Sequence, residues 1–250
     1  MVDAAGNVFL AGPTTDSSVG VIAENGHQNS FGGGGGFGDS GDAYLVKFSA
    51  DGSRLWGTYY GGSASDYGYS CAVDAGDNIY LAGMTRSTNA ISENGHQGTY
   101  GGASPGVNGD AFLVKFSSTG MRLWGTYFGG SSDDIGYSCA AGPDGVVYLS
   151  GSTRSVSGIA NGGAQNTYGG SDSDAFLSKF DANGAFQWAT YYGGSSVDNG
   201  YSCTTDASGN VFFAGSTLSL DGIADNGYQN THGGNWDAFL VKFNAGGTRI

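Results

Sequence analysis

Short runs of alternating residues recur along the chain, separated by turns rich in Gly, Asp, Asn and Ser. In residues 42–48, Tyr44 and Val46 fall on one face of a strand, and Leu45 and Lys47 fall on the other. Such a strand is expected to be buried on both faces except at the lysine. Runs of this length between Gly-rich turns, with no long run of good helix formers, predict an all-β protein.

These runs belong to a repeat of 64–71 residues. Each unit has a first to a fourth strand, expected in the second unit near 69–73, 78–83, 110–116 and 123–128, and the long loop after the second strand is called the 2–3 loop. Four antiparallel strands at this period are typical of propeller blades, since solenoid coils are shorter and sandwiches do not repeat. The prediction is a β-propeller or propeller-like array with four blade-equivalents, at about 1–62, 63–130, 131–194 and 195–250.

The first and last blade-equivalents are expected to be incomplete. Residues 1–3 align with the end of a first strand in the second unit, and Ile250 aligns with Leu123, where a fourth strand begins. An unpaired strand edge is a template for strand addition. We therefore expect these edges to pair with neighbouring repeats of a longer chain or with another copy of this chain.

Five segments carry the most distinctive residue order of the repeat. They are Asp110-Ala-Phe-Leu-Val-Lys115, Thr126-Tyr-Phe-Gly-Gly-Ser131, Asp134-Ile-Gly136, the 2–3 loop run Gly95–Gly102, and the run from Asp206 to Thr217. Together they resemble the bacterial β-propeller repeat known as the SBBP repeat, over essentially the whole chain. The resemblance implies a propeller on secreted or cell-surface bacterial proteins. It implies no established catalytic activity or ligand.

Composition narrows the class of protein further. Glycine accounts for 49 of 250 residues, but 39% of the residues are hydrophobic and 13% are aromatic, which argues against a disordered chain. The net charge of −13 argues against nucleic acid as a partner, because phosphates would be repelled. No apolar run approaches the roughly 20 residues of a membrane helix, so no membrane insertion is expected. With the resemblance, this acidic composition predicts an extracellular or cell-surface location.

Catalytic groups have little support in the repeat. His27, His96 and His232 do not recur beside a recurring Ser or Cys, so no enzyme activity is expected. Each cysteine occupies the same strand position of its unit, which predicts core residues and no disulfide framework. The cysteines are Cys71, Cys139 and Cys203.

Acidic residues recur in the Gly-rich loops between units. Asp66, Asp134 and Asp198 share the pattern Gly-Gly-Ser-x-x-Asp-x-Gly. Oxygen-rich loops of this kind suit calcium, and no other cofactor is expected. The alternative is that each Asp accepts backbone N–H bonds and stabilises its own turn without a metal.

Lysines and tryptophans are also tied to the repeat. All four lysines share one third-strand position and are expected to pair with a repeated Asp, because a buried unpaired charge is too costly. Trp56, Trp124 and Trp188 share a fourth-strand position, where packing between blades is expected and a sugar-stacking platform is the alternative. Trp236 has no equivalent and is predicted to be an exposed contact. The lysines are Lys47, Lys115, Lys179 and Lys242.

The 2–3 loops carry a repeated pair of one amide and one ring. The amides are Gln28, Gln97, Gln165 and Gln229, and the rings three residues later are Phe31, Tyr100, Tyr168 and His232. Such pairs are common in sugar-binding sites. The alternative is that each Gln satisfies the backbone groups of its own loop.

Two functions follow from these patterns. The leading hypothesis is a non-catalytic extracellular structural or adhesive module that associates with itself end to end, as a fibre or surface array. The alternative is a carbohydrate-binding, lectin-like propeller that takes glycans as partners through its 2–3 loops and Trp236.

Overall fold

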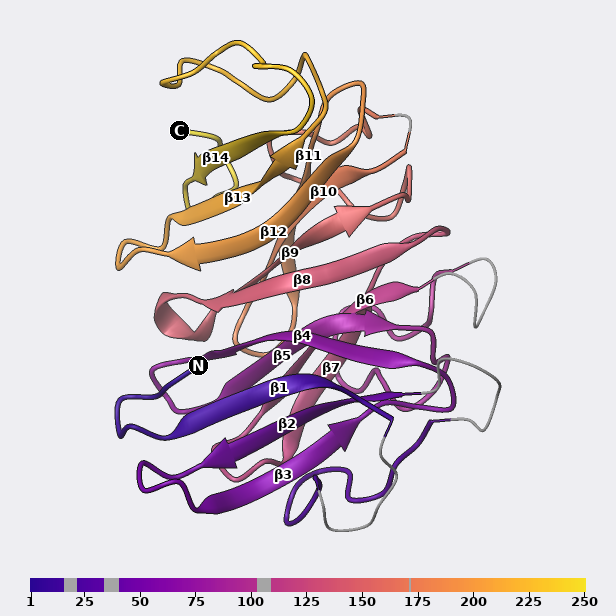
Figure 1. Cartoon of the computed structure of the whole chain (residues 1–250), viewed down its shortest axis with the longest axis vertical. Coiled ribbons are helices and arrows are strands. Elements are labelled where there is room, and N and C mark those ends of the chain that lie inside the picture. The colour runs from indigo at the N-terminus through magenta and orange to yellow at the C-terminus, as the bar shows by residue number, and fades with distance from the viewer. Residues whose placement is uncertain (16–21, 34–40, 103–108, 171) are drawn as a thin grey trace.

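The computed structural model describes residues 1–15, 22–33, 41–102, 109–170 and 172–250. In these residues the chain forms fourteen strands in four antiparallel sheets, which we call the first to fourth blade (Figure 1). One 3-10 turn, Pro143–Gly145, joins β8 to β9. The described residues contain no helix with the length and hydrophobicity needed to cross a bilayer. The fold is all-β, as predicted.

Consecutive strands pair within each blade. The first blade contains β1 (Val8–Thr14), β2 (Asp42–Phe48) and β3 (Arg54–Tyr60). The second contains β4 (Asp66–Val73), β5 (Ile79–Thr85), β6 (Asp110–Phe116) and β7 (Arg122–Phe128). The third contains β8 (Asp134–Ala141), β9 (Val147–Thr153), β10 (Asp174–Phe180) and β11 (Phe186–Tyr192). The fourth contains β12 (Asp198–Thr205), β13 (Val211–Thr217) and β14 (Asp237–Phe243).

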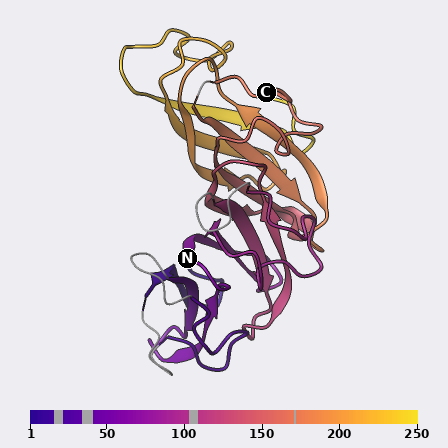
Figure 2. The same cartoon turned by 90° about the vertical axis from the view of Figure 1, so that its right-hand side faces the viewer.

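The blades stack along the long axis of the molecule and do not close into a ring (Figure 2). The first strands β4, β8 and β12 are successive neighbours, since β4 contacts β8 and β8 contacts β12. The fourth strands β7 and β11 lie at the opposite edge of their blades. The middle blades have four strands and the outer two have three, which agrees with the predicted propeller-like array.

The hydrophobic core lies between the blades. One cluster joins Trp56 of the first blade to Ile79 and Phe112 of the second, and comparable clusters join the later blades. All seven residues of β6 are buried. Contact between neighbouring blades therefore contributes to stability, since each buried aromatic side chain removes about 150–250 Å² from water.

The third-strand lysine is buried in the first and second blades, contrary to the prediction, and is partly exposed in the third and fourth. Lys47 and Lys115 are only 7% and 5% exposed. Lys115 Nζ lies 3.3 Å from Asp74 Oδ2 and 5.1 Å from the ring centre of Tyr80. The charge tolerates burial because a carboxylate and an aromatic face replace the water it loses.

The first strand of a blade begins earlier than predicted. β4 begins at Asp66, which pairs with Thr85, and it continues through a β-bulge between Gly68 and Ser70. Tyr69 is the extra residue of this bulge. The same bulge recurs in β8 and β12, so strict alternation is lost in the part of the strand where the prediction failed.

Candidate functional site

The tryptophans connect each blade to the next. Trp56 Nε1 donates a hydrogen bond to the Ser118 carbonyl at 3.0 Å, in the turn between β6 and β7. The indole covers Gly120 so closely that a methyl group there would lie 2.8 Å from it. Trp124 and Trp188 repeat the bond, each at 3.1 Å, to Ala182 and Ala245. Packing between blades, the expected role, is confirmed.

The lysines reinforce the same contacts. Lys115 Nζ also donates to the Ala182 carbonyl at 3.2 Å, so Trp124 and Lys115 share one acceptor in the next blade. The predicted carboxylate partner is found for three lysines. These pairs are Lys47–Asp3 at 3.7 Å, Lys115–Asp74 at 3.3 Å and Lys242–Asp206 at 3.4 Å.

Lys179 departs from this pattern. Its blade has Gly142 where the others have the paired Asp. Lys179 instead donates to the Ala245 carbonyl at 2.8 Å, and its Nζ lies 5.7 Å from the ring centre of Tyr148. Partial burial lowers the pKa of this ammonium group.

The 2–3 loop glutamines bond to their own blades. Gln97 Nε2 donates to the Thr99 carbonyl at 3.0 Å and to Asp110 Oδ2 at 3.3 Å, and its Oε1 accepts from Gly129 N at 3.1 Å. Gln28 and Gln165 repeat these three bonds. The amide thus fastens the loop to the third strand and to the end of the fourth.

The loop rings also face their own blades. Tyr100 meets Tyr127 edge-on with ring centres 6.0 Å apart. Phe31 meets Tyr59 at 5.7 Å and Tyr168 meets Tyr191 at 5.6 Å in the same way. In the first three blades this arrangement agrees with the structural alternative for the 2–3 loops.

The fourth 2–3 loop is more open. Gln229 and His232 line a cavity of about 140 Å³. Trp236 is 53% exposed, as its predicted role as an exposed contact requires, but it lies outside the lining of this cavity. The amide and ring of this loop therefore both face a cavity.

The recurring acidic residues form buried pairs between blades. Gly61 follows β3, and a methyl group on it would lie 2.6 Å from Asp66 Oδ2 and 2.8 Å from Asp42 Oδ1. Gly129 separates Asp110 from Asp134 and Gly193 separates Asp174 from Asp198 in the same way. All six carboxylates are fully buried.

Donor groups surround these carboxylates. Asp66 accepts hydrogen bonds from Thr85 Oγ1, from Ser87 Oγ at 2.8 Å and from Gly62 N at 2.9 Å. Burial nevertheless raises the pKa of Asp66 to about 7 and that of Asp42 to about 6, since the charged forms lose water.

Calcium at Asp66, Asp134 and Asp198 stays a prediction. In the described part of the chain, no group of three or more His, Cys, Asp and Glu side chains is placed to hold a metal. A calcium site requires six to eight oxygen ligands, and here N–H and O–H donors occupy much of the space around each carboxylate. Calcium binding would raise the melting temperature above its value in EGTA.

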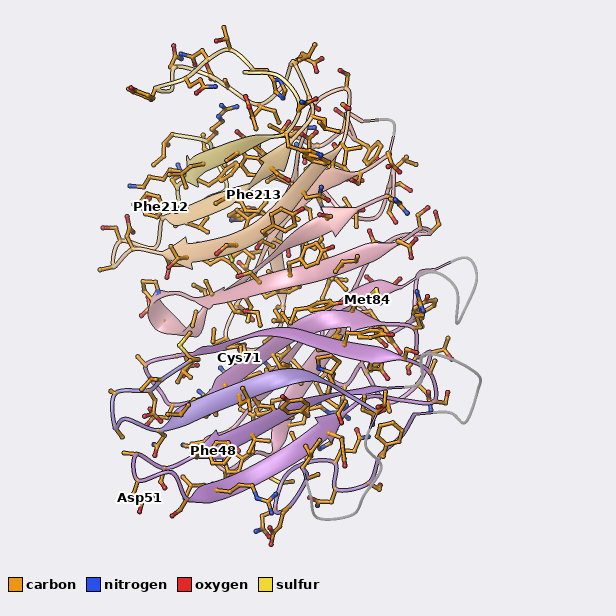
Figure 3. All side chains as sticks on the ribbon, viewed as in Figure 1. Phe48, Asp51, Cys71, Met84, Phe212 and Phe213 are labelled. Carbon is orange, nitrogen blue, oxygen red and sulfur yellow. The ribbon has the colours of Figure 1, made fainter. Side chains whose placement is uncertain are left out.

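The cysteines and two histidines are packed against their surroundings. Cys139 and Cys203 are buried and Cys71 is half-buried, and all three thiols are free. Figure 3 marks Cys71 on β4. His96 stacks on Phe186 of the third blade with ring centres 4.7 Å apart. The ring of His27 lies beside that of Phe116 in the second blade, with ring centres 6.3 Å apart.

Sequence reasoning overlooked a row of tyrosines on the first strands. The bulge residues Tyr69, Tyr137 and Tyr201 contact one another in order, with ring centres 5.7 and 5.6 Å apart. Tyr69 and Tyr201 are 43% and 51% exposed. The signal was present, because the same Tyr precedes Ser-Cys in three units, but the run was interpreted only as a strand.

Antiparallel blades that stack through their faces define a β-propeller repeat array. Residues 187–221 match SBBP, a beta-propeller repeat family, and this segment contains β12, β13 and nearly all of β11. The resemblance seen in the sequence is confirmed for this segment. The other units share its motifs through internal repetition.

One relative is similar to about half of the chain. Regulatory protein FlaEY of Caulobacter vibrioides is 28% identical to it over 136 residues. The aligned region is 54% of this chain and 14% of that protein, so the chain spans only a small part of the relative's length.

Proposed function

We propose that the chain is a non-catalytic structural or adhesive module, extracellular or on a cell surface, whose outer blades bind further blades end to end. The repeated contact between neighbouring blades carries this proposal. In each internal contact a Trp covers a turn Gly and hydrogen-bonds to a carbonyl of the same turn. The Trp recurs in three units and the turn Gly in four, so the residues that join blades belong to the repeat.

The first blade presents the same turn uncovered. A methyl group on Gly52 would meet no atom within 4 Å, whereas the equivalent Gly120, Gly184 and Gly247 lie under indole rings. Ala50, which corresponds to the carbonyl acceptors of the other turns, is exposed. This face supports docking of one more blade.

The fourth blade presents the opposite face. A groove of about 710 Å³ runs along β14, and Phe212 and Leu240 line it. Phe212 is labelled beside β13 in Figure 3, and Leu240 is 74% exposed. Lys242 has 34% of its side chain exposed, whereas Lys115 and Lys179 each donate a hydrogen bond to a carbonyl of the next blade. In this sequence the fourth blade has no Trp at the position of Trp56, so we infer that a blade of a second copy docks in this groove without a further indole contact.

Solution mass and electron microscopy test the proposal. We expect the mass of the purified chain to rise with concentration above 25.3 kDa and short filaments to be visible. Leu240→Arg places a charge in the groove and keeps the chain monomeric. Leu123→Arg, on a half-exposed side chain of β7 away from both end faces, is the matched control and assembles normally. A wild-type chain that stays monomeric at every concentration would refute the proposal.

Glycan binding is the second candidate, and the open fourth loop favours it. Gln229 and His232 line a cavity there, and Trp236 is exposed nearby in the sequence. A glycan array with wild type, His232→Ala and Trp236→Ala distinguishes the two candidates. Under this alternative both variants lose a glycan signal while keeping their melting temperature.

A further inference from the structure

A second cavity lies between the second and third blades, away from both end faces. It measures about 340 Å³, and its wall includes Tyr69, Tyr137, Arg86 and Arg154. Met84, labelled at the end of β5 in Figure 3, adds an apolar wall. Pockets of this size that combine aromatic walls with polar groups commonly hold small ligands.

The tyrosine side is shaped by the β-bulges. A bulge redirects one side chain out of the regular alternation of a strand. Tyr69 and Tyr137 are the extra residues in β4 and β8, and their rings meet at a tilt of 46°. A phenol ring offers an apolar face and a hydroxyl group together, which suits a sugar ring with its C–H face and hydroxyl edge.

The arginine side carries an unbalanced charge. Arg154 pairs with Asp133 at 3.7 Å and with Asp172 at 3.2 Å. At the corresponding positions around Arg86 the sequence has Ser65 and Asn108, of which Asn108 lies outside the described residues. Among the described residues Arg86 forms no salt bridge, and its Nε is buried without a hydrogen-bond partner. A guanidinium group that has a buried donor and no carboxylate partner favours a carboxylate ligand.

The third charged group on the wall is already engaged. Asp133 pairs with Arg154 and accepts a hydrogen bond from Gly109 N at 3.0 Å. Ser152 and Asn199 also line the cavity and are bonded to each other at 3.0 Å. The cavity therefore combines aromatic faces, short polar groups and one available positive charge.

We propose that this cavity binds an acidic saccharide, with a sugar ring against Tyr69 and Tyr137 and its carboxylate on Arg86. The net charge of −13 disfavours long polyanions, so a short oligosaccharide fits better than a nucleic acid or a polyphosphate. The site is separate from the end faces for which assembly is proposed.

Calorimetric titration with uronic-acid trimers tests this site. The probes are trimers of galacturonate, glucuronate and mannuronate, together with their neutral counterparts, at low salt. We expect at least one acidic trimer to bind at least tenfold more tightly than its neutral counterpart. No measurable binding of any acidic trimer at millimolar concentration would overturn the proposal.

Variants separate the roles of the two sides. Ser65→Asp gives Arg86 the carboxylate that Asp133 gives Arg154, and it abolishes the preference for acidic trimers. Arg86→Gln does the same by removing the charge. Tyr137→Ala weakens both acidic and neutral binding, whereas Tyr201→Ala, on the same row but outside the cavity, is the matched control. An unchanged acidic preference in both Ser65→Asp and Arg86→Gln, with the melting temperature retained, would also overturn the proposal.

Discussion

Gln97 joins three segments through its side chain: its own loop, Asp110 on β6 and Gly129 after β7. Gln97→Ala removes all three bonds and leaves part of a buried carboxylate unsatisfied. We expect a loss of about 1–3 kcal/mol of folding free energy. A melting temperature lowered by about 2–4 °C per kcal/mol, measured by calorimetry, checks this expectation.

Gln229→Ala is the matched control for Gln97. Gln229 is exposed, and its bonds go to the Thr231 carbonyl at 3.0 Å and to Asp237 at 3.5 Å. Its loss is expected to cost less than about 1 kcal/mol, because water replaces the lost partners. If Gln97→Ala abolished glycan binding and left the melting temperature unchanged, the 2–3 loops would be binding sites instead.

The paired carboxylates predict an unusual pH dependence of stability. Burial raises the pKa of Asp42, Asp110 and Asp174 to about 6 and of Asp66 and Asp134 to about 7. The folded chain thus binds more protons than the unfolded chain above about pH 4, and its stability falls as pH rises through 6 and 7. We expect the melting temperature to drop by about 5 °C or more between pH 5 and pH 8.

Asp42→Asn tests the cause of this drop. Asp42 Oδ1 is buried without a hydrogen-bond partner and faces Asp66 across Gly61. An amide at this position donates toward Asp66 and carries no charge. The variant should therefore lose less stability than wild type between pH 5 and pH 8. An equally steep loss in the variant would assign the pH dependence to other groups.

At the scale of single elements, the turn between β8 and β9 is the exception in the array. Gly142 and Val146 replace the Asp and Asn that close the equivalent turn at Asp74 and Asn78. Lys179 consequently lacks the carboxylate partner that the other three lysines have. The double variant Gly142→Asp, Val146→Asn restores both groups.

We expect this double variant to be more stable than wild type by about 1 kcal/mol, because it supplies turn hydrogen bonds and an ion pair. The Asn replacement is needed because a Cβ on Gly142 would lie 2.8 Å from Val146 Cγ2. Gly142→Asp alone is therefore the less stable comparison. Denaturant unfolding measures the difference, and a double variant no more stable than wild type would contradict the expected role of the turn.

The elements whose positions were predicted well are those that alternate strictly. The third strand was expected at 110–116, and β6 has these bounds, because both of its faces are buried and the pattern is not interrupted. The first strand was misplaced because a bulge breaks the alternation at Tyr69. Repetition also identified the Trp contacts. A Trp at the same fourth-strand position of successive blades indicates that each interface between blades contains the same contact.

Side-chain surroundings were harder to predict than strands. The burial of Lys115 depends on Tyr80 and on Ala182 of the next blade, which is 67 residues away in the chain. The unpaired charge of Arg86 reflects a difference between units, because Ser65 stands where the third unit has Asp133 and the fourth has Val197. Repetition predicts shared contacts, so a site that exists in one interface is visible only when blades are compared in space.

At the scale of the whole molecule, stability depends on which blades have two neighbours. In a stacked array each unit contacts only adjacent units, so its stability is set by its own pairing and by its interfaces. The second and third blades are covered on both faces, and every residue of β5, β6 and β9 is buried. β1 and β14 carry exposed Leu10 and Leu240 on the outer faces.

Hydrogen exchange measured along the chain tests this gradient and its link to assembly. We expect amides of β6 and β10 to exchange slowest and those of β1 and β14 to exchange first, since local opening requires the loss of fewer contacts at the ends. Raising the protein concentration should slow exchange in β1 and β14 together, because end-to-end docking covers both faces. Leu240→Arg should abolish this concentration effect while leaving β6 and β10 unchanged. Equal exchange in all four blades would show that the array opens as one cooperative unit and would contradict the expected gradient of stability.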